Sequence, residues 1–444
     1  MRAAGGSHKR QPHPIGGCRG AEPDGDSGSD SATSGEAAVA RGKLADQLRA
    51  AGRAEGAVEA AFRKVPRHAF LPEMEPVSAY QDRAVVIKSD SDGLPVSAST
   101  QPAMMAIMLG QLGLEPGHRV LEVGAGTGYN VALIACLVGS QESVVTIDVV
   151  PELIEQAREN LAAAGYGAVK VVCGDGAAGV PDYAPYDRII VTTGAWDLPP
   201  EWWAQLCPGG RIVLPLSIRG IQLSVGLDSA GDHLVSRSAC RCSFIRMAGA
   251  MARPESLIAL GPQPGLHAQA VDGPAPTAGE LYEALSGPAE EEASGVWASS
   301  IAQVADLDLW LTLTEPGLTR LNLMGRHETH ASPAQQRIAN LMPLGGLARV
   351  GGPSALGVAA FTFEDDETQP GSFKITACGY GPGGPSLATH LATQARVWEE
   401  LGRPGAAGLA LSAWLPGTPL QTIGGATMVL DRPHVRLALH WPAS

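Results

Sequence analysis

The hydrophobic pattern between residues 119 and 148 predicts a strand, a sharp turn, a helix and a second strand. Residues 119–123 are apolar apart from their ends, which is typical of a parallel strand buried on both faces. Every second position of the following turn is glycine, where the backbone must bend and approach a ligand closely. These glycines are Gly124, Gly126 and Gly128. Residues 129–137 form an apolar run of helical length, and residues 144–147 form a second buried strand that ends at Asp148. The pattern predicts a βαβ unit whose closing carboxylate binds ribose hydroxyls.

The segments before this unit predict a disordered leader and then helices. Residues 1–38 are rich in Gly, Ser, Ala and Asp without apolar periodicity, which favours disorder. From Arg41 apolar residues recur at helical spacing, and a second helix is expected over residues 55–64. The elements expected next are a strand over residues 84–88, a polar loop over 89–100 and a helix over 102–112 that begins at a proline.

The residues after this unit predict further strands and a separate C-terminal region. Residues 251–277 contain a Pro- and Gly-rich stretch and are expected to be a linker. The alternating pattern of residues 305–311 predicts a half-buried strand, and residues 386–401 carry apolar side chains at helical spacing. The other strands expected are residues 222–227, 234–246, 357–363, 373–378, 407–414 and 434–441.

The glycine spacing distinguishes between ligands. A dinucleotide-binding turn has the pattern G-x-G-x-x-G, but Tyr129 occupies the last position, so the turn here is G-x-G-x-G. This variant resembles the first motif of Rossmann-like methyltransferases, which bind S-adenosylmethionine. A dinucleotide-binding or purely structural turn is the alternative that the glycines alone leave open.

Further motifs, in order along the chain, resemble the protein-L-isoaspartate O-methyltransferase family. They cover residues 42 to about 247. The motifs are Val65-Pro66-Arg67, Phe70, Pro72, Ala79-Tyr80, Thr100-Gln101-Pro102, and residues 172–176, 184–192 and 206–213. The resemblance implies a Rossmann-like class I methyltransferase with a mixed, doubly wound α/β sheet and a C-terminal α+β domain. The domains it implies are a leader (1–38), a methyltransferase domain (39–250), a linker (251–277) and a C-terminal accessory domain (278–444).

Two departures from the family pattern favour one branch of it. The family has Thr-Ile-Ser-x-Pro at its substrate loop, whereas residues 97–102 place Thr100 where serine is usual. The stretch before this loop, residues 89–95, also replaces a glycine-rich stretch. The second departure is the C-terminal region, because the repair fold would end shortly after the strands expected at 222–227 and 234–246. This loop and the C-terminal region resemble the branch that modifies ribosomally made peptides such as lanthipeptides and graspetides. The substrate is then an aspartate of a constrained peptide, and general repair of isoaspartyl-damaged protein is the near alternative.

The resemblance also implies roles for individual residues. Glu122 and the three glycines would surround the methionine end of S-adenosylmethionine, Asp148 the ribose, and Asp175 with Gly176 the adenine. Ser99, Thr100 and Gln101 would contact the substrate carboxylate. A helix N-cap is the alternative for those three residues, and a turn residue is the alternative for Asp175.

The chemistry of a carboxylate substrate agrees with this set of residues. A phenol or amine needs a positioned base before it can accept a methyl group. A carboxyl group in water has a pKa near ~4 and is already ionised at neutral pH. It needs only to be held beside the methyl group with water excluded. No histidine or glutamate that could act as a base stands beside the cofactor motifs, as expected for such a substrate.

Composition limits the remaining possibilities. The formal net charge of −13 argues against a nucleic-acid substrate held through its phosphates, and no segment predicts a membrane span. The seven cysteines form no C-x-x-C pair, which favours free thiols in a reducing, cytoplasmic compartment. His327 and His330 are three apart without a carboxylate cluster, so no metal site is expected. A binding module without turnover and a nucleic-acid methyltransferase remain as alternative functions.

Overall fold

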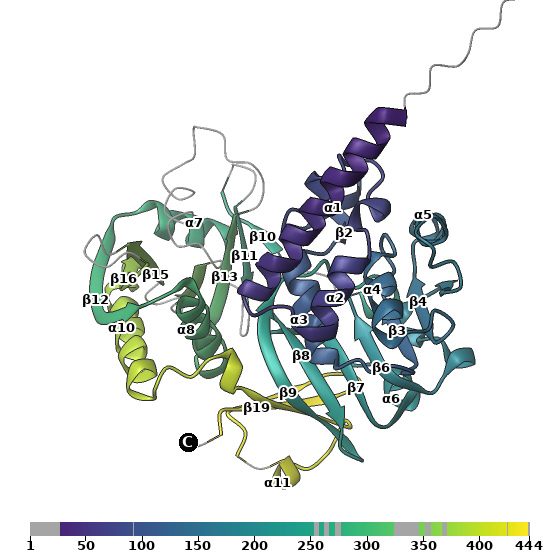
Figure 1. Ribbon diagram of the computed structural model, residues 1–444. Helices are drawn as coiled ribbons and strands as arrows, with labels where there is room; N and C mark the ends of the chain where they lie inside the picture. The colour runs from purple at the N-terminus through teal and green to yellow at the C-terminus, as the bar shows by residue number, and fades with distance from the viewer. Residues whose placement is uncertain are drawn as a thin grey trace, which may run out of the picture.

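Two β-sheets with helices packed on them organise the protein. The computed structural model describes residues 27–91, 93–252, 257–261, 266–270, 277–323, 346–350, 357–365, 371–423 and 425–442. In these residues, ten strands form a main sheet and seven form a second sheet, and a two-stranded hairpin stands apart (Figure 1). The hairpin consists of β1 (Val85–Ser89) and β2 (Pro95–Ser99).

The first half of the main sheet is parallel, as predicted. Its strand order is β5-β4-β3-β6-β7, and each neighbouring pair runs parallel. These strands are β3 (Val120–Val123), β4 (Val144–Asp148), β5 (Lys170–Cys173), β6 (Tyr186–Val191) and β7 (Leu206–Ile218). Every residue of β3 is buried, because helices or loops cover the sheet on both faces. The predicted α/β methyltransferase fold is therefore confirmed.

Helices cover both faces of this parallel part. On one face, apolar side chains of α1 to α4 share a core with sheet residues such as Val120, Val144 and Val213. On the other face, Trp202 and its neighbours pack against Leu121 and Val145. The helices are α1 (Ser27–Ala50), α2 (Gly56–Lys64), α3 (Pro102–Leu112), α4 (Tyr129–Val138), α5 (Pro151–Ala163) and α6 (Pro200–Ala204).

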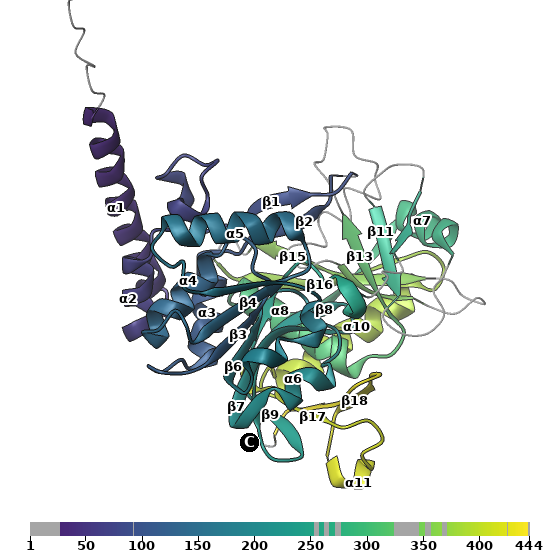
Figure 2. The same ribbon diagram turned by 90° about the vertical axis from the view of Figure 1, so that its right-hand side faces the viewer.

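The second half of the main sheet is antiparallel and contains the end of the chain. Strand β7 pairs with β8 (Ile221–Ser229), and β8 pairs with β9 (His233–Cys242). Strand β9 then pairs with β17 (Ala410–Trp414), which pairs with β19 (Arg436–His440); β18 (Met428–Asp431) is the edge. Figure 2 shows β17 in yellow next to β9, with β18 farther out at the edge. The last strands therefore complete the methyltransferase sheet, whereas the sequence predicted residues 278–444 as one accessory domain.

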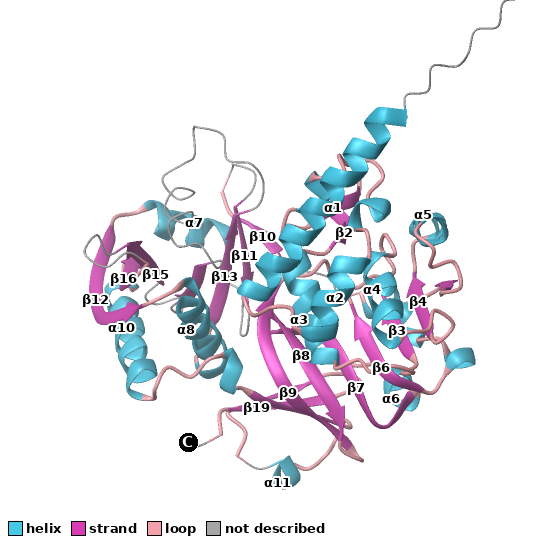
Figure 3. Ribbon diagram, viewed as in Figure 1, coloured by secondary structure: helices cyan, strands magenta, loops and turns pink. Residues whose placement is uncertain are grey.

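The second sheet contains the rest of the C-terminal region. Its order is β10-β11-β13-β14-β15-β16-β12, and all neighbouring pairs are antiparallel. The strands are β10 (Leu257–Ala259), β11 (Leu266–Ala270), β12 (Ala289–Ala298), β13 (Leu318–Leu323), β14 (Gly346–Val350), β15 (Val358–Asp365) and β16 (Phe373–Tyr380). The helices of this region are α7 (Ala278–Ser286), α8 (Ile301–Thr314) and α10 (Gly384–Glu400), whereas the short α11 (Leu420–Ile423) lies along the chain between β17 and β18 of the main sheet. The predicted helix near 386–401 and strands near 357–363 and 373–378 are confirmed (Figure 3).

Residues 305–311 were predicted as a strand and are instead part of helix α8. Leu309 and Leu313 pack in the core of the main sheet, whereas Val304, Leu307 and Leu311 pack in the core of the second sheet. Because both sides of the helix are buried, its apolar residues are not confined to one face and do not show the usual period of an amphipathic helix. This helix joins the two sheets.

Three further segments differ from the sequence expectation. Helix α1 begins at Ser27, inside the predicted leader, and Ala37 of α1 is fully buried in the core of α1 to α4. The predicted polar loop 89–100 contains strand β2, paired with β1. The predicted linker 251–277 contains β10 and β11, which belong to the second sheet. In each case contacts with another segment of the chain stabilise a structure that the local sequence pattern did not predict.

Candidate active site

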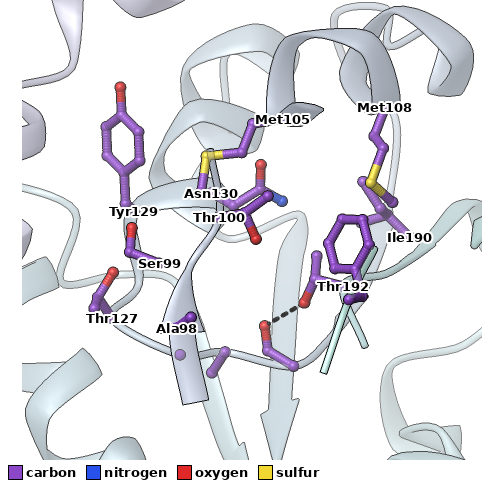
Figure 4. Close-up of a pocket in the computed structure, with 14 residues that line it drawn as sticks. Ala98, Ser99, Thr100, Met105, Met108, Thr127, Tyr129, Asn130, Ile190 and Thr192 are labelled. Carbon is purple, nitrogen blue, oxygen red and sulfur yellow. Dashed lines mark hydrogen bonds between the residues drawn. The ribbon is translucent and has the colours of Figure 1, made fainter. Parts of the chain in front are cut away.

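A cavity opens where β3 and β6 end, between the glycine turn and the start of α3. It encloses about 430 Å³ of empty space, part of it open to solvent. In Figure 4, Ser99 and Thr127 lie on one side, Ile190 and Thr192 lie on the other, and the two methionines of α3 lie above. The lining residues are Ala98, Ser99, Thr100, Met105, Met108, Gly124, Ala125, Gly126, Thr127, Tyr129, Asn130, Ile190, Thr192 and Phe244.

The three glycines of the turn serve different purposes. All have positive φ angles: +105° at Gly124, +49° at Gly126 and +87° at Gly128. A Cβ at Gly124 would overlap Thr192 Oγ1, and one at Gly128 would lie 3.1 Å from Leu161 Cγ. A Cβ at Gly126 would meet nothing within 4 Å. Packing therefore requires the outer two glycines, whereas the middle one leaves open space beside the cavity.

Asp148 holds the turn from the end of the neighbouring strand. Its Oδ2 accepts a hydrogen bond from the backbone N–H of Gly126 at 3.2 Å, and its Oδ1 accepts one from the N–H of Val150 at 3.1 Å. Each carboxylate oxygen can accept more than one hydrogen bond, so the partly exposed carboxylate can also accept hydroxyl donors.

Glu122 lies beneath the turn and does not line the cavity. Its side chain is fully buried, and its two oxygens accept hydrogen bonds from Asn130 Nδ2 at 2.8 Å and Thr146 Oγ1 at 2.7 Å. Burial raises the pKa of the Glu122 carboxyl to about 7, and the two hydrogen bonds oppose this shift. Glu122 therefore fixes Asn130, which does line the cavity.

Asp175 and Gly176 follow β5 and lie outside the residues that line the cavity. Asp175 Oδ1 accepts a hydrogen bond from Ala177 N at 2.9 Å, and Oδ2 accepts one from Ala250 N at 2.6 Å. Gly176 is buried against Val123, and its carbonyl accepts the indole N–H of Trp202 at 2.9 Å. Asp175 therefore joins the end of β5 to the segment after β9, as a turn residue would.

The predicted substrate residues divide into two groups. Ser99 and Thr100 line the cavity, and Ser99 is only 3% exposed. Gln101 is exposed and points elsewhere, because its Nε2 donates to Asp82 Oδ2 at 3.1 Å. Asp82 also accepts Ala103 N at 2.8 Å and so caps the start of α3. The structure thus places Gln101 with the helix cap and the two hydroxyls with the cavity.

Arg67 is a residue of this site to which the sequence assigned no role. It lies in η1 (Arg67–Phe70), is 0% exposed, and its Nη2 donates to Thr100 O at 3.1 Å and Ser99 Oγ at 3.3 Å. Its guanidinium carbon lies 5.6 Å from the ring centre of Tyr129, a cation–π contact. Arg67 was visible in the sequence only as part of the Val-Pro-Arg motif.

The cavity suits S-adenosylmethionine in its polar and apolar parts. Asn130 Oδ1 is buried and has no hydrogen-bond partner among the described residues, so it can accept a hydrogen bond from an ammonium group. The open space beside Gly126 admits a ligand close to the backbone. Met105, Met108, Ile190 and Phe244 provide an apolar wall for a sulfonium and its methyl group.

Neither a metal-binding cluster nor a membrane-spanning helix is present in the described part of the chain. No group of three or more His, Cys, Asp or Glu residues there could hold a metal ion. No helix of that part is long and apolar enough to cross a membrane. His327 and His330 lie outside the described residues.

Comparisons with known proteins agree with this geometry. Residues 40–252 match the family model described as protein-L-isoaspartate(D-aspartate) O-methyltransferase. A protein-L-isoaspartate O-methyltransferase of Methanopyrus kandleri is 42% identical over 214 residues, which are 47% of this chain and 92% of that protein. The protein-L-isoaspartate O-methyltransferase 2 of Archaeoglobus fulgidus is 44% identical over 176 residues, 40% of this chain and 78% of that protein.

A solved structure named protein-L-isoaspartate O-methyltransferase aligns over a longer part of the chain. It covers 84% of this chain and 96% of its own, at 25% sequence identity and a TM-score of 0.46.

Proposed function

The chain belongs to the protein-L-isoaspartate(D-aspartate) O-methyltransferase family and is an S-adenosylmethionine-dependent methyltransferase, and we propose that it methylates the free carboxylate of an aspartyl or isoaspartyl residue in a peptide. The observation that carries the choice of a carboxylate is the cavity lining. The described residues that line the cavity have hydroxyl, amide and apolar side chains, and none of them is Asp, Glu, His, Lys, Arg or Cys. Such a cavity can orient an anion and offers no strong base, and a carboxylate needs none.

The residues around the cavity divide the work of the transfer. When bound, S-adenosylmethionine supplies an electrophilic methyl group on a positively charged sulfur. The glycine turn and Asn130 would hold the methionine end, and Asp148 would accept the ribose hydroxyls. Asp175 and Gly176 would lie beside the adenine. Ser99 and Thr100 would donate hydrogen bonds to the substrate carboxylate and hold it beside the methyl group, while the apolar wall excludes water.

The expected product is a methyl ester that reacts further. Esterification gives the carboxyl group a better leaving group, so the neighbouring backbone nitrogen attacks it, expels methanol and forms a succinimide. Hydrolysis of the succinimide gives aspartate or isoaspartate. The same enzyme chemistry therefore serves repair of damaged protein or deliberate modification of a peptide.

Between these two uses, we propose modification of a ribosomally made peptide. The support is the altered substrate loop, with Thr100 in the position where the family has serine, and the large C-terminal region that shares the main sheet. Repair is the second candidate. The relatives that match over most of their own length are named protein-L-isoaspartate O-methyltransferases, and their names mention no peptide modification.

The test offers two substrates to the purified protein with S-adenosylmethionine. One is a linear isoaspartyl peptide, and the other is a cyclised precursor peptide with an internal aspartate; methyl incorporation is followed by mass spectrometry. Turnover of the cyclised peptide supports peptide modification, and strong turnover of the linear peptide alone supports repair. Binding of S-adenosylmethionine by calorimetry without methylation of either peptide, or of other carboxylate peptides, would favour a binding module instead.

A further inference from the structure

Arg67 is a buried cation that has no buried counter-charge among the described residues. Its side chain is 0% exposed, and within the described part of the chain its Nε and Nη1 atoms have no hydrogen-bond partner. Nη2 donates to the oxygens of Ser99 and Thr100 and, at 3.4 Å, to the backbone oxygen of Arg83. No carboxylate in the described part of the chain forms an ion pair with Arg67, although burying an unpaired charge is costly. An arrangement that is incomplete in this way points to a negatively charged ligand nearby.

The contacts of Arg67 direct its charge toward the cavity. Ser99, Thr100 and Tyr129 all line the cavity, and all three contact the guanidinium. Arg67 itself does not line the cavity, so its charge is separated from the cavity by the residues that it contacts. The titratable or charged groups that face Arg67 from neighbouring elements are Tyr129, Tyr80, Asp82 and Arg83. Asp82 is engaged with Gln101 and Ala103.

The hydrogen bond to Ser99 also fixes the direction of the serine hydroxyl. Ser99 Oγ accepts from Arg67, so its own proton must point away from the guanidinium. No acceptor for this proton is present among the described residues. The cavity is where an acceptor can be placed.

We propose that Arg67 is a positioning residue for the substrate carboxylate: its charge favours an anion in the cavity, and its hydrogen bond turns the Ser99 hydroxyl toward that anion. The inference rests on the proposed function. It assigns to Arg67 the selectivity of the Ser99 and Thr100 hydroxyls for a negatively charged substrate group. The chain thereby recognises an ionised carboxylate without touching it with a cation.

The indirect placement suits the chemistry of the step. The carboxylate oxygen forms a bond to the methyl carbon while the carbon–sulfur bond breaks, so an anion and a sulfonium become a neutral ester and a neutral thioether. A cation in direct contact would stabilise the carboxylate more than the transition state, in which that charge is disappearing, and would slow the transfer. Behind the wall, Arg67 attracts the carboxylate and leaves its attacking oxygen free.

Three substitutions test this inference in the full-length protein with an isoaspartyl peptide. Arg67→Gln keeps hydrogen-bond donors but removes the charge, whereas Arg67→Lys keeps the charge. Arg67→Gln should raise KM for the peptide about tenfold or more with a smaller change in kcat, and should leave the affinity for S-adenosylmethionine within about twofold. Arg67→Lys should restore most of the loss. The matched control is Arg63→Gln, because Arg63 is paired with Asp46 and Glu59 and does not contact the cavity wall.

The pH profile separates this role from a merely structural one. Without the nearby cation the bound carboxylate binds a proton more readily, so the acid limb of kcat should move to higher pH by about one unit in Arg67→Gln. It should stay near the wild-type position in Arg67→Lys and Arg63→Gln. Glu122, whose pKa burial raises to about 7, is present in every variant, so the comparison is made between variants and not with a single profile.

The outcomes are distinct. Equal KM values and acid limbs in Arg67→Gln and Arg67→Lys would overturn the inference, because charge would then not matter. If Arg67→Gln does not fold, Ser99→Ala in the wild-type and Arg67→Lys backgrounds decides: the serine substitution should raise KM for the peptide about tenfold in both, and no change would overturn the inference. A wild-type protein that methylates no carboxylate peptide would instead overturn the proposed function.

Discussion

The two ends of the main sheet are built in opposite ways. In the parallel half, the paired strands β3 and β4 are joined by one short helix, and the glycine turn lies between them. In the antiparallel half, β9 pairs with β17 after an intervening region that contains the whole second sheet. The parallel end is formed by segments that are close in sequence. The antiparallel end is formed when the C-terminal strands β17, β18 and β19 return to the main sheet, which we call the distant return. This comparison shows why the cofactor side is easy to predict from sequence and the far edge is not.

The distant return also reaches the neighbourhood of the cavity. His434, just before β19, donates its backbone N–H to Asp197 Oδ2 at 2.9 Å, and its Nδ1 lies 2.9 Å from the same oxygen. Asp197 is fully buried in the loop that follows β6, whose first residue, Thr192, lines the cavity. The C-terminal strands therefore support the loop on one side of the site.

The strongest test of the comparison removes the distant return. A chain ending at Ala252 would expose the edge of β9 and uncover core residues that pack against Leu411, Leu437 and Leu439. We expect loss of cooperative unfolding and of S-adenosylmethionine binding, measured by circular dichroism and calorimetry. As a point test, Ala413→Asp places a charge at a fully buried position of β17, whereas Leu415→Asp changes an exposed residue just after that strand. A truncated protein that keeps its Tm and its affinity would mean that the C-terminal region is only appended.

The next test addresses the glycine turn in the parallel half of the main sheet. Gly124→Ala combines a φ of +105° with an overlap of the new Cβ and Thr192 Oγ1, so we expect a loss of about 4 kcal/mol of stability. Gly126→Ala has open space around the new Cβ and should cost only about 1 kcal/mol while still weakening S-adenosylmethionine binding. Chemical denaturation and calorimetry measure the two effects. Equal losses of stability would contradict the division between a packing glycine and a ligand glycine.

The third test uses pH. The folded state raises the pKa of Glu122 from 4.5 to about 7, so it holds this proton more strongly than the unfolded state. This difference contributes up to about 3 kcal/mol to the free energy of unfolding. The contribution is fully present below about pH 4.5 and is lost as the pH rises through about 7. Glu122→Gln cannot ionise, so its Tm relative to wild type should rise between pH 5 and pH 8. A constant Tm difference across this range would show that Glu122 does not titrate there.

The smallest expected effect belongs to the contact between Asp197 and His434. His434→Ala removes the side-chain partner but keeps the backbone donor, and the imidazole is 42% exposed, so we expect a loss of about 1 kcal/mol. Because Asp197 supports the loop after β6, KM for the peptide should rise slightly. Asp197→Ala, which leaves the backbone N–H of His434 without its acceptor, should cost more. A larger effect of His434→Ala than of Asp197→Ala would contradict this contact geometry.

The sequence was sufficient for elements whose pattern and neighbours are local. The strand over residues 119–123, the three glycines and the helix from Pro102 to Leu112 are found where predicted. Ser99 and Thr100 were selected from a motif and lie in the cavity wall. Gln101 belonged to the same motif, yet its side chain bonds to Asp82, a contact that depends on how two loops meet.

The sequence by itself determined the βαβ unit and the chemistry of its turn, because a buried parallel strand and alternating glycines leave few other backbone conformations. Only the tertiary structure decided that residues 305–311 form a helix, since that helix is buried between two cores and its apolar pattern lost the one-sided period. The same holds for Arg67 and the last three strands. Arg67 contacts residues that are far from it in sequence, and β17 pairs with β9 although the whole second sheet lies between them in sequence. A local sequence pattern cannot predict contacts of this kind.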